Sequence, residues 1–355
     1  MRLDIPVLQD SPTVDASFNT TTLPLLEAQY DLEGTKGGEA PSGQLMFSPR
    51  IGANYQLSDK TTIRGGFGIF TSRVPFVWPG GMYTNNGVTI GGLDERDIDG
   101  DVTFIADPQA QYTNPNVTVP AGQVDLFASN FKYPQVFRTS LAVDQEFGQG
   151  WNFSIEGMYT KTLNNVLYKN VNSDTEVAYN WTNGADDRPI YTNSRIDDTY
   201  TAVYLGTNTN EGFAYNFTTK LDKVFRNGLN IMLAYSVGDA ESLIEGTSSQ
   251  NSSQWRGSFN VDGRNNPMIG RSDFSPGSRI IAGAGYEIDW TKNGLFNTTL
   301  SMFYNGQSGE LYSYVYNNVN LSRESGSTSR ERDLIYVPTS ADDIVLVDIT
   351  NDDGQ

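Results

Sequence analysis

Apolar and polar residues alternate along four pairs of stretches in this chain, and a short polar turn joins the two stretches of each pair. In the first pair, for example, Ile63 and Phe67 alternate with Arg64 and Gly66. A period of two predicts a strand with one apolar and one polar side, so each pair predicts a β-hairpin. The turns are Ser58-Asp59-Lys60, Gly148-Gln149-Gly150, Arg226-Asn227-Gly228 and Thr291-Lys292-Asn293-Gly294, and the hairpins are expected at residues 44–71, 134–163, 212–238 and 277–306.

Long polar segments separate one expected hairpin from the next, so tight turns alternate with long connections along the chain. Transmembrane β-barrels have this asymmetry, with short turns at the periplasmic end and longer loops at the extracellular end. Residues 1–43 are expected to complete one preceding strand and then to form such a loop. The stretches 199–207 and 311–317 alternate or are rich in aromatic residues, and we expect them to extend hairpins above the membrane.

The polar side of the expected strands favours a membrane barrel over a soluble sandwich or barrel. A soluble sandwich buries its apolar faces, whereas a membrane barrel turns them to lipid and keeps polar groups in its lumen. Here the polar side mixes small residues with isolated charges of both signs, as expected for paired charges in a wet lumen. The charged residues expected to face the lumen are Arg50, Arg64, Arg138, Asp144, Glu156, Lys220 and Asp222.

Strand length and the position of aromatic residues also favour the membrane barrel. Each stretch runs for about 10 to 13 residues, and a tilted strand needs roughly 9 to 11 to span the bilayer. Aromatic residues such as Tyr55, Trp151 and Trp290 lie close to the tight turns, as in the aromatic girdle of a barrel. The expected fold class is therefore all-β, a partial transmembrane antiparallel β-barrel of about 8 to 10 strands.

Composition excludes several other classes. The chain has no apolar run near the roughly 18 residues of a membrane helix, so residence in a membrane would require a barrel. Its net charge of −18 argues against a nucleic-acid partner, because phosphates must be neutralised by Lys and Arg. Cysteine and histidine are absent, which excludes thiolate or imidazole metal sites and Ser-His-Asp or Cys-His catalysis. We therefore expect no enzymatic activity and no cofactor.

The two ends of the sequence predict an internal fragment. Residues Met1 to Pro6 have neither the basic nor the apolar region of an export signal. Residues Asn351 to Gln355 are polar, whereas a barrel is expected to end on a strand with a terminal aromatic residue. Eight strands would also leave two unpaired edges, which cannot face lipid. The remaining strands are expected from a longer polypeptide.

Several short segments between residues 44 and 338 follow one another in a characteristic order. They include Phe47-Ser48-Pro49-Arg50-Ile51-Gly52, Thr62-Ile63-Arg64-Gly65-Gly66-Phe67-Gly68, Tyr133-Pro134-Gln135-Val136-Phe137-Arg138, Glu156-Gly157-Met158-Tyr159-Thr160-Lys161, Ser248-Ser249-Gln250 with Trp255, Arg271-Ser272-Asp273-Phe274, and Asp333-Leu334-Ile335-Tyr336-Val337-Pro338. Together they resemble the barrel of TonB-dependent outer-membrane receptors, specifically the Oar-like group.

The resemblance implies a barrel of about 22 strands with a plugged lumen, of which this chain would be a segment toward the C-terminal end. It also implies the outer membrane of a Gram-negative cell, with outer-membrane lipid around the barrel and energised uptake of an unidentified small or bulky solute. Two further partners are implied in regions that this sequence does not contain. These are the protein's own plug domain and TonB, which delivers energy through a short motif near the N-terminus.

Three arginines on the expected lumen side have two interpretations. Arg50, Arg64 and Arg138 either contact a plug or a substrate, or they pair with Asp144 or Glu156 across neighbouring strands. We prefer the pairing, because it compensates charges that are partly removed from water.

Aromatic residues in the expected loops are candidates for contact with a solute. Trp78, Tyr83, Trp181 and Trp255 have flat rings that stack on a sugar or a similar ligand at the mouth of a barrel. The same side chains also pack long loops into an ordered cap, and we consider that role the more frequent one.

An acidic turn raises the question of a metal ion. Asp97, Asp99 and Asp101 offer hard oxygen ligands of the kind that calcium prefers. The helix-loop-helix setting and the bidentate glutamate of an EF-hand are missing, so a solvated acidic turn is preferred and no metal site is expected.

We expect the chain to form the barrel wall and the substrate-capturing loops of a TonB-dependent receptor for energised uptake. One alternative is a secreted all-β binding or adhesin domain, in which the apolar strand faces would be folded inward. A second alternative is a passive porin, which has the barrel but no energy coupling.

Overall fold

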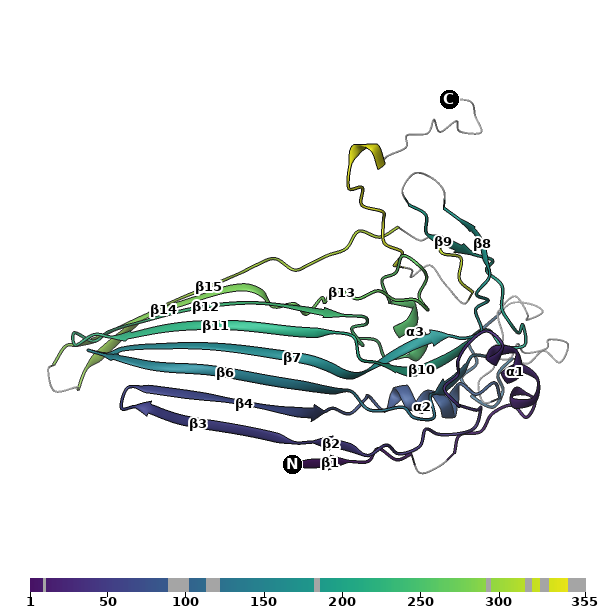
Figure 1. The fold of residues 1–355 in the computed structure, drawn as a ribbon, viewed down its shortest axis with the longest axis horizontal. Helices are drawn as coiled ribbons and strands as arrows, with labels where there is room; N and C mark the ends of the chain where they lie inside the picture. The colour runs from purple at the N-terminus through teal and green to yellow at the C-terminus, as the bar shows by residue number, and fades with distance from the viewer. Residues whose placement is uncertain are drawn as a thin grey trace.

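The computed structural model of this chain describes residues 1–8, 11–88, 102–112, 122–181, 186–291, 295–316, 321–325 and 332–343. Long antiparallel strands form most of the molecule, and the tight turns lie together at one end of them (Figure 1). The long connections fold at the opposite end, together with the short helices and the remaining strands (Figure 1).

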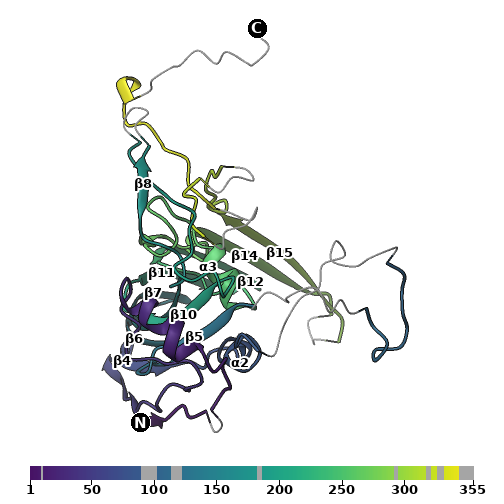
Figure 2. The same cartoon turned by 90° about the vertical axis from the view of Figure 1, so that its right-hand side faces the viewer.

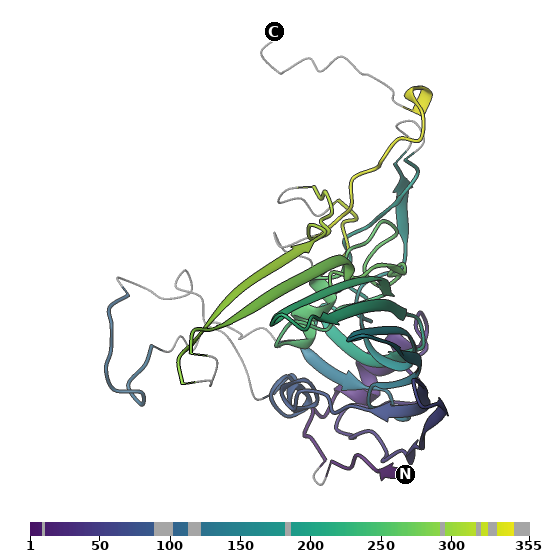
Figure 3. The same cartoon turned by 90° about the vertical axis from the view of Figure 1, so that its left-hand side faces the viewer.

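Eight long strands form one antiparallel sheet. Each of them is hydrogen-bonded to the long strand that precedes it and to the long strand that follows it along the chain. They are β3 (Arg50–Ser58), β4 (Thr61–Thr71), β6 (Gln135–Gly148), β7 (Trp151–Asn170), β11 (Phe213–Val224), β12 (Leu229–Ser242), β14 (Gly277–Asp289) and β15 (Asn297–Gln307). Figures 2 and 3 show that this sheet is curved but does not close on itself. The chain is therefore all-β, with the open antiparallel sheet of a partial barrel.

In the register of the sheet, a row of mainly polar residues crosses the strands, each residue lying opposite the next. Arg64 lies opposite Ala142, Ala142 opposite Glu156, and Glu156 opposite Thr218. The row continues through Ser236, Arg279 and Gln307 on β12, β14 and β15. Because side chains directly opposite each other share a face, this row defines one polar face of the whole sheet.

The other face of the sheet carries large apolar side chains that remain exposed. Leu141 is 62% exposed, and Phe217 lies on the same face because it pairs with Gly157, which pairs with Leu141. Further exposed members of this apolar face are Ile51, Tyr55, Phe67, Tyr159, Tyr215, Leu233, Tyr235, Val237, Tyr286, Leu300, Met302 and Tyr304. An apolar surface of this extent is typical of a sheet whose outer face contacts lipid.

The first 48 residues begin with a short strand, which a long connection follows. β1 (Arg2–Asp4) is very short and pairs with β2 (Met46–Ser48), so both strands of this pair lie beside the edge of the main sheet. Between them the chain forms a one-turn π-helix (Phe18–Thr22) that continues into α1 (Leu23–Glu27). Pro24 lies at the start of α1.

Beyond the main sheet, β7 continues to Asn170 and pairs there with β10 (Val203–Thr209), which in turn pairs in parallel with β5 (Val124–Phe127). Strand β10 confirms the expectation that residues 199–207 contain additional strand. By contrast, residues 311–316 are not a strand, and only Val315 makes an isolated bridge, to Leu334. The expected extension of a hairpin at 311–317 is therefore wrong for the residues that are described.

This three-stranded extension of β7, β10 and β5 is buried on both faces. One face packs against α2 (Val77–Thr84) and α3 (Asn251–Arg256), where Trp78, Phe127 and Trp255 form an apolar core. The other face packs against the N-terminal segment, where Phe18 and Leu26 are members of a second core. We call the extension and the segments that cover it the cap.

The alternation of side chains explains the two cores. Val203 and Leu205 of β10 lie opposite Val124 and Leu126 of β5, and all four belong to the core of the N-terminal segment. The intervening Tyr204 points to the other side, into the core of the two helices. Such strands read as continuous apolar runs because both of their faces are buried.

The remaining elements are small. The hairpin of β8 (Val177–Asn180) and β9 (Pro189–Tyr191) projects from the cap, and β13 (Gly270–Arg271) pairs with the end of β12 (Figure 1). A 3-10 helix covers Ala341–Asp343. None of the helices in the described part of the chain is long and apolar enough to cross a membrane.

Candidate functional site

A branched ion pair lies on the polar face of the sheet. Arg64 on β4 donates from Nε to Asp144 at 2.9 Å and from Nη2 to Glu156 at 3.0 Å, so that it links β4 to both β6 and β7. The arginine reaches Glu156 across Ala142, whose small side chain is 2% exposed beneath it. The pairing preferred from the sequence is therefore found for Arg64. Farther along the same face, Lys220 pairs with Asp222 at 2.9 Å.

The other two arginines of this face do not pair with the expected acids. The guanidinium of Arg50 lies 4.4 Å from the centre of the Phe70 ring, and that of Arg138 lies 5.9 Å from the same ring. Arg138 also donates to the hydroxyl of Thr160. Arg50 and Arg138 lie opposite Gly68 in the register, so the space above the glycine leaves room for both to flank the ring. The expected pairing of these two arginines with Asp144 or Glu156 is wrong.

Two of the tryptophans expected to contact a solute are buried in the cap instead. Trp78 is 6% exposed and Trp255 is fully buried, both in the core between α2 and α3. Each indole N–H already has an acceptor: Trp78 donates to the carbonyl of Ser248 and Trp255 to the side chain of Asn265. Neither ring is available for stacking, and the structure corrects that interpretation in favour of cap packing.

The other two candidate aromatics are partly exposed. Tyr83 on α2 packs against the same core as Trp78, while Trp181 lies beside β8 and its backbone N–H bonds to Arg188. Other aromatic rings in the connections are exposed, among them Phe76 and the edge-to-face pair of Tyr312 and Tyr314.

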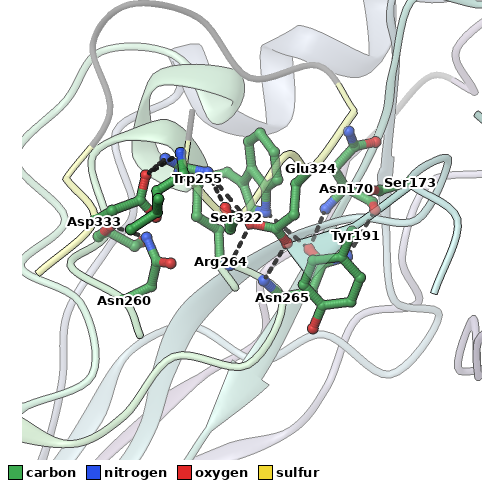
Figure 4. Close-up of polar contacts among 12 residues, drawn as sticks. Asn170, Ser173, Tyr191, Trp255, Asn260, Arg264, Asn265, Ser322, Glu324 and Asp333 are labelled. Carbon is green, nitrogen blue, oxygen red and sulfur yellow. Dashed lines mark hydrogen bonds and ion pairs between the residues drawn. The ribbon is translucent and has the colours of Figure 1, made fainter. Parts of the chain in front are cut away.

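A buried polar network joins three distant segments of the cap, as Figure 4 shows. Arg264 is fully buried, and its Nη1 lies 3.3 Å from Glu324 while its Nη2 lies 3.6 Å from Asp333. Glu324 also accepts the backbone N–H of Arg264 at 2.7 Å. Burial raises the pKa of the Glu324 carboxyl above its ordinary value, and the nearby Arg264 opposes that shift.

Asn265 extends this network to the barrel and to the N-terminal segment. Its side-chain amide donates to the carbonyl of Asn170 at the end of β7 and to the hydroxyl of Tyr30. Tyr30 donates in turn to the carbonyl of Ser173. Burial raises the pKa of the Tyr30 hydroxyl, so this phenol stays protonated as a donor. The alternation of the sequence contained no signal for these contacts, because they join polar loop residues far apart in the chain.

A second buried carboxylate lies between β5, α2 and α3. Asp125 is 3% exposed and accepts hydrogen bonds from the side chains of Gln123, Asn85 and Asn251. All three donors are neutral amides, so burial dominates and raises the pKa of Asp125 to about 6. Asn251 also donates to the carbonyl of Trp78, which connects the two helices.

The cap contains a cavity of about 480 Å³ beside α3. Its lining is rich in hydroxyl and amide groups and includes three arginines, Arg256, Arg271 and Arg332. Trp255, the candidate solute contact on α3, does not line the cavity. The suggested calcium ligands Asp97, Asp99 and Asp101 lie outside the described residues. Within the described ranges, no three acidic side chains gather as a metal site would require.

An open antiparallel sheet with one apolar exposed face, one polar face and loops folded at a single end defines a β-barrel protein of the outer membrane. In agreement, the profile of a family described as outer membrane beta barrel domain matches residues 10–348. The chain belongs to this family and is an outer-membrane protein. A search among curated proteins gave no significant match.

Solved structures of outer-membrane receptors are similar in fold. The outer membrane transporter YddB from Escherichia coli is 10% identical with a TM-score of 0.41, over 79% of this chain and 31% of that chain. The siderophore receptor PirA from Pseudomonas aeruginosa is 9% identical with a TM-score of 0.34, over 75% and 34%. For the ferric enterobactin receptor PfeA from Pseudomonas aeruginosa the values are 9% and 0.36, over 82% and 38%. This chain spans about a third of the length of these structures, and the likeness concerns the fold alone.

Proposed function

We propose that this chain forms the barrel wall and the solute-capturing cap of a TonB-dependent receptor of the Oar-like group, and that it takes part in the energised uptake of a solute across the outer membrane. The observation that carries the proposal is the cap: the connections at one end of the sheet fold into two apolar cores and a polar cavity. A receptor that captures a solute needs a concave and largely preformed site.

The polar face of the sheet supports the same function. In this proposal it lines the lumen, where Arg64, Asp144 and Glu156 hold one another in place and Arg50 and Arg138 remain for contact with a plug domain or a solute. The open edges of β3 and β15 would be paired by further strands of a barrel of about 22 strands, since unpaired strand edges are not tolerated in lipid. No catalytic step is proposed for this chain.

The proposal includes an orientation, with the tight turns in the periplasm and the cap outside the cell. Because the chain has no cysteine, single introduced cysteines report their own side of the membrane. A membrane-impermeant maleimide added to intact cells is expected to label Tyr312→Cys, which replaces a side chain that is 76% exposed, and not Asn227→Cys in a turn. The opposite labelling pattern would contradict the orientation.

Uptake itself is tested in cells that carry the intact protein. Loss of solutes from a defined mixture in the medium is followed by mass spectrometry in wild-type cells, in cells without this protein, and in cells without TonB. The proposal expects depletion of at least one solute that requires both proteins and stops when the proton gradient is collapsed. Depletion that persists without TonB would indicate a passive porin.

A further inference from the structure

The cavity in the cap has a defined position relative to the barrel. It lies beside α3, and α3 shares its apolar core with α2, which lies on the concave side of the curved sheet (Figures 2 and 3). Its lining begins with Ser242 at the end of β12 and continues along residues 243–250. A solute held there would sit above the inner side of the wall rather than on the surface that faces lipid.

Hydrogen bonds fix the walls of the cavity. The carbonyl oxygen of Ser248 accepts from Trp78 Nε1 at 3.0 Å and from Gln254 Nε2 at 2.6 Å, so the loop after β12 is attached to both helices. Glu245 accepts from the hydroxyls of Ser242 and Ser272 and from the backbone N–H of Asp273. These contacts preform the site, which lowers the ordering cost of binding a ligand.

The three arginines of the lining differ in their partners. Arg271 donates from both Nε and Nη2 to Asp239, at 3.0 and 2.7 Å, and is therefore neutralised. Among the described residues, Arg256 donates a side-chain hydrogen bond to the hydroxyl of Ser253, at 3.3 Å, and its buried Nε has no hydrogen-bond partner. Arg332 lies over the ring of Phe259 at 5.0 Å. Within the described part of the chain neither Arg256 nor Arg332 forms an ion pair, although Asp273 also lines the cavity.

We propose that this cavity binds the carboxylate or phosphate group of a small polar solute, with Arg256 as its principal ligand. A guanidinium presents a planar set of donors that matches the oxygens of such a group, and hydrogen bonds between two charged groups are the strong ones. A bound oxyanion would accept from the guanidinium Nη groups of Arg256, the residue that lines the cavity. Surrounding hydroxyl and amide groups, such as Ser253 and Gln250, suit the polar remainder of the solute.

Cationic and purely neutral solutes fit the site less well. Of the two acids in the lining, Glu245 already accepts hydrogen bonds from the wall with both oxygens, and Asp273 shares the cavity with three arginines that repel a cation. A neutral solute would leave the charge of Arg256 without compensation in a partly enclosed site. The volume lies within the roughly 300 to 1,000 Å³ of ordinary small-molecule sites. This proposal adds a solute class to the proposed function. Only the later transport of the bound solute rests on that function.

The test compares matched sugars on the intact protein in detergent by titration calorimetry. D-Glucuronate and glucose 6-phosphate each differ from D-glucose by one acidic group. We expect the acidic sugars to bind at least about tenfold more tightly than glucose, because the arginine pairs only with an oxyanion. Equal affinities for the three sugars, or no binding of either acidic sugar, would overturn the proposal.

Substitutions assign the effect to Arg256. Arg256→Gln is expected to remove the preference for the acidic sugars, and Arg256→Lys to restore part of it, because lysine keeps the charge but not the planar fork. Arg226→Gln, in a tight turn at the opposite end of the sheet, is the matched control and should change nothing. Unchanged acidic preference in a folded Arg256→Gln protein, verified by its melting temperature, would also overturn the proposal.

The two proposals fail in different ways. If the acidic sugars bind through Arg256 but no solute requires TonB for its depletion from the medium, the cavity stands and energised uptake falls. If uptake requires TonB but Arg256→Gln leaves the acidic preference unchanged, the receptor stands and the anion site falls.

Discussion

Arg264 and Glu324 form an ion pair at 3.3 Å in the interior of the cap, where their side chains are 0% and 3% exposed. Sixty residues of sequence separate them, and neither lies in a strand of the barrel wall. Charges removed from water to this degree are costly unless each is compensated by the other and by further hydrogen bonds. The pair therefore makes the fold of the cap depend on the segment that carries Glu324.

Breaking this pair should loosen the cap without unfolding the barrel wall. Glu324→Gln removes the partner charge and is expected to destabilise the cap by about 3 kcal/mol, the cost of leaving a buried charge partly uncompensated. Limited proteolysis should then cleave near residues 322–325 at lower protease concentration. Glu310→Gln, at an exposed position, is the control and should behave as the wild type. Equal protease resistance of the two variants would contradict the structural role of the pair.

Adjacent residues on β11 should respond in opposite ways to the same substitution. Phe217 lies on the apolar face, whereas Thr218 lies on the polar face opposite Glu156. Phe217→Arg is expected to cost about 2 to 4 kcal/mol if it lies near the bilayer midplane, while Thr218→Arg should be tolerated because it gains a carboxylate neighbour. Urea unfolding in lipid vesicles measures the difference. Comparable losses at both positions would show that the apolar face does not contact lipid.

Two consecutive glycines of α2 provide a second matched pair. A β-carbon at Gly80 would meet nothing within 4 Å, whereas at Gly81 it would collide with the carboxylate of Asp125. Gly80→Ala is therefore expected to stabilise the cap by up to about 1 kcal/mol through helix propensity. Gly81→Ala should destabilise it by about 1 to 3 kcal/mol through overpacking. Hydrogen exchange of the β5 amides reports both effects, and a gain in protection for Gly81→Ala would refute the close approach.

The stability of the cap should fall as the pH rises from 4 to 7. The native pKa of Asp125 is about 6, above its ordinary value of 3.8, so the folded state binds more protons than the unfolded state between these values. Deprotonation of Asp125 is expected to lower the free energy of unfolding of the cap by up to about 3 kcal/mol. This loss is complete above pH 7 and absent below pH 4.

The asparagine variant isolates this contribution from that of other carboxyl groups. Asp125→Asn cannot ionise, so its cap should lose the part of the pH dependence that Asp125 supplies, as measured by hydrogen exchange of β5 and β10 at several pH values. Asp198→Asn, whose native side chain is 91% exposed, should retain the wild-type profile. Parallel profiles for the wild type and Asp125→Asn would exclude the buried carboxylate as the cause.

The strands of the wall could be predicted because the causes of their structure are local. Alternation with a period of two specifies a strand and both of its faces, and tight turns such as Arg226-Asn227-Gly228 specify which strands are neighbours. Even a cross-strand contact followed from this register, since Arg64 and Glu156 lie on one face of neighbouring hairpins. The sequence indicated less clearly which side chains of β10 point to which face, because a strand that is buried on both sides does not alternate between apolar and polar residues.

The roles of the loop aromatics were left with two interpretations, solute contact or cap packing, because their causes are not local. Trp78 and Trp255 are large aromatic side chains in long connections, and composition alone does not distinguish a ring that binds a solute from one that packs a core. Their burial depends on α2 and α3 meeting across β10, which joins segments far apart in the chain. The same holds for Arg256, whose Nε has no hydrogen-bond partner within the described part of the assembled cap.

The pattern of the sequence is enough to predict that tight turns alternate with long connections, and to predict the antiparallel hairpins and the two faces of the wall, because period and turn chemistry act over a few residues. The fate of the long connections depends on contacts between segments that are far apart in the chain. They fold into a cap because apolar residues of the N-terminal segment, β5 and β10 bury one another, and because buried charges such as Arg264 must find their partners wherever the chain brings them.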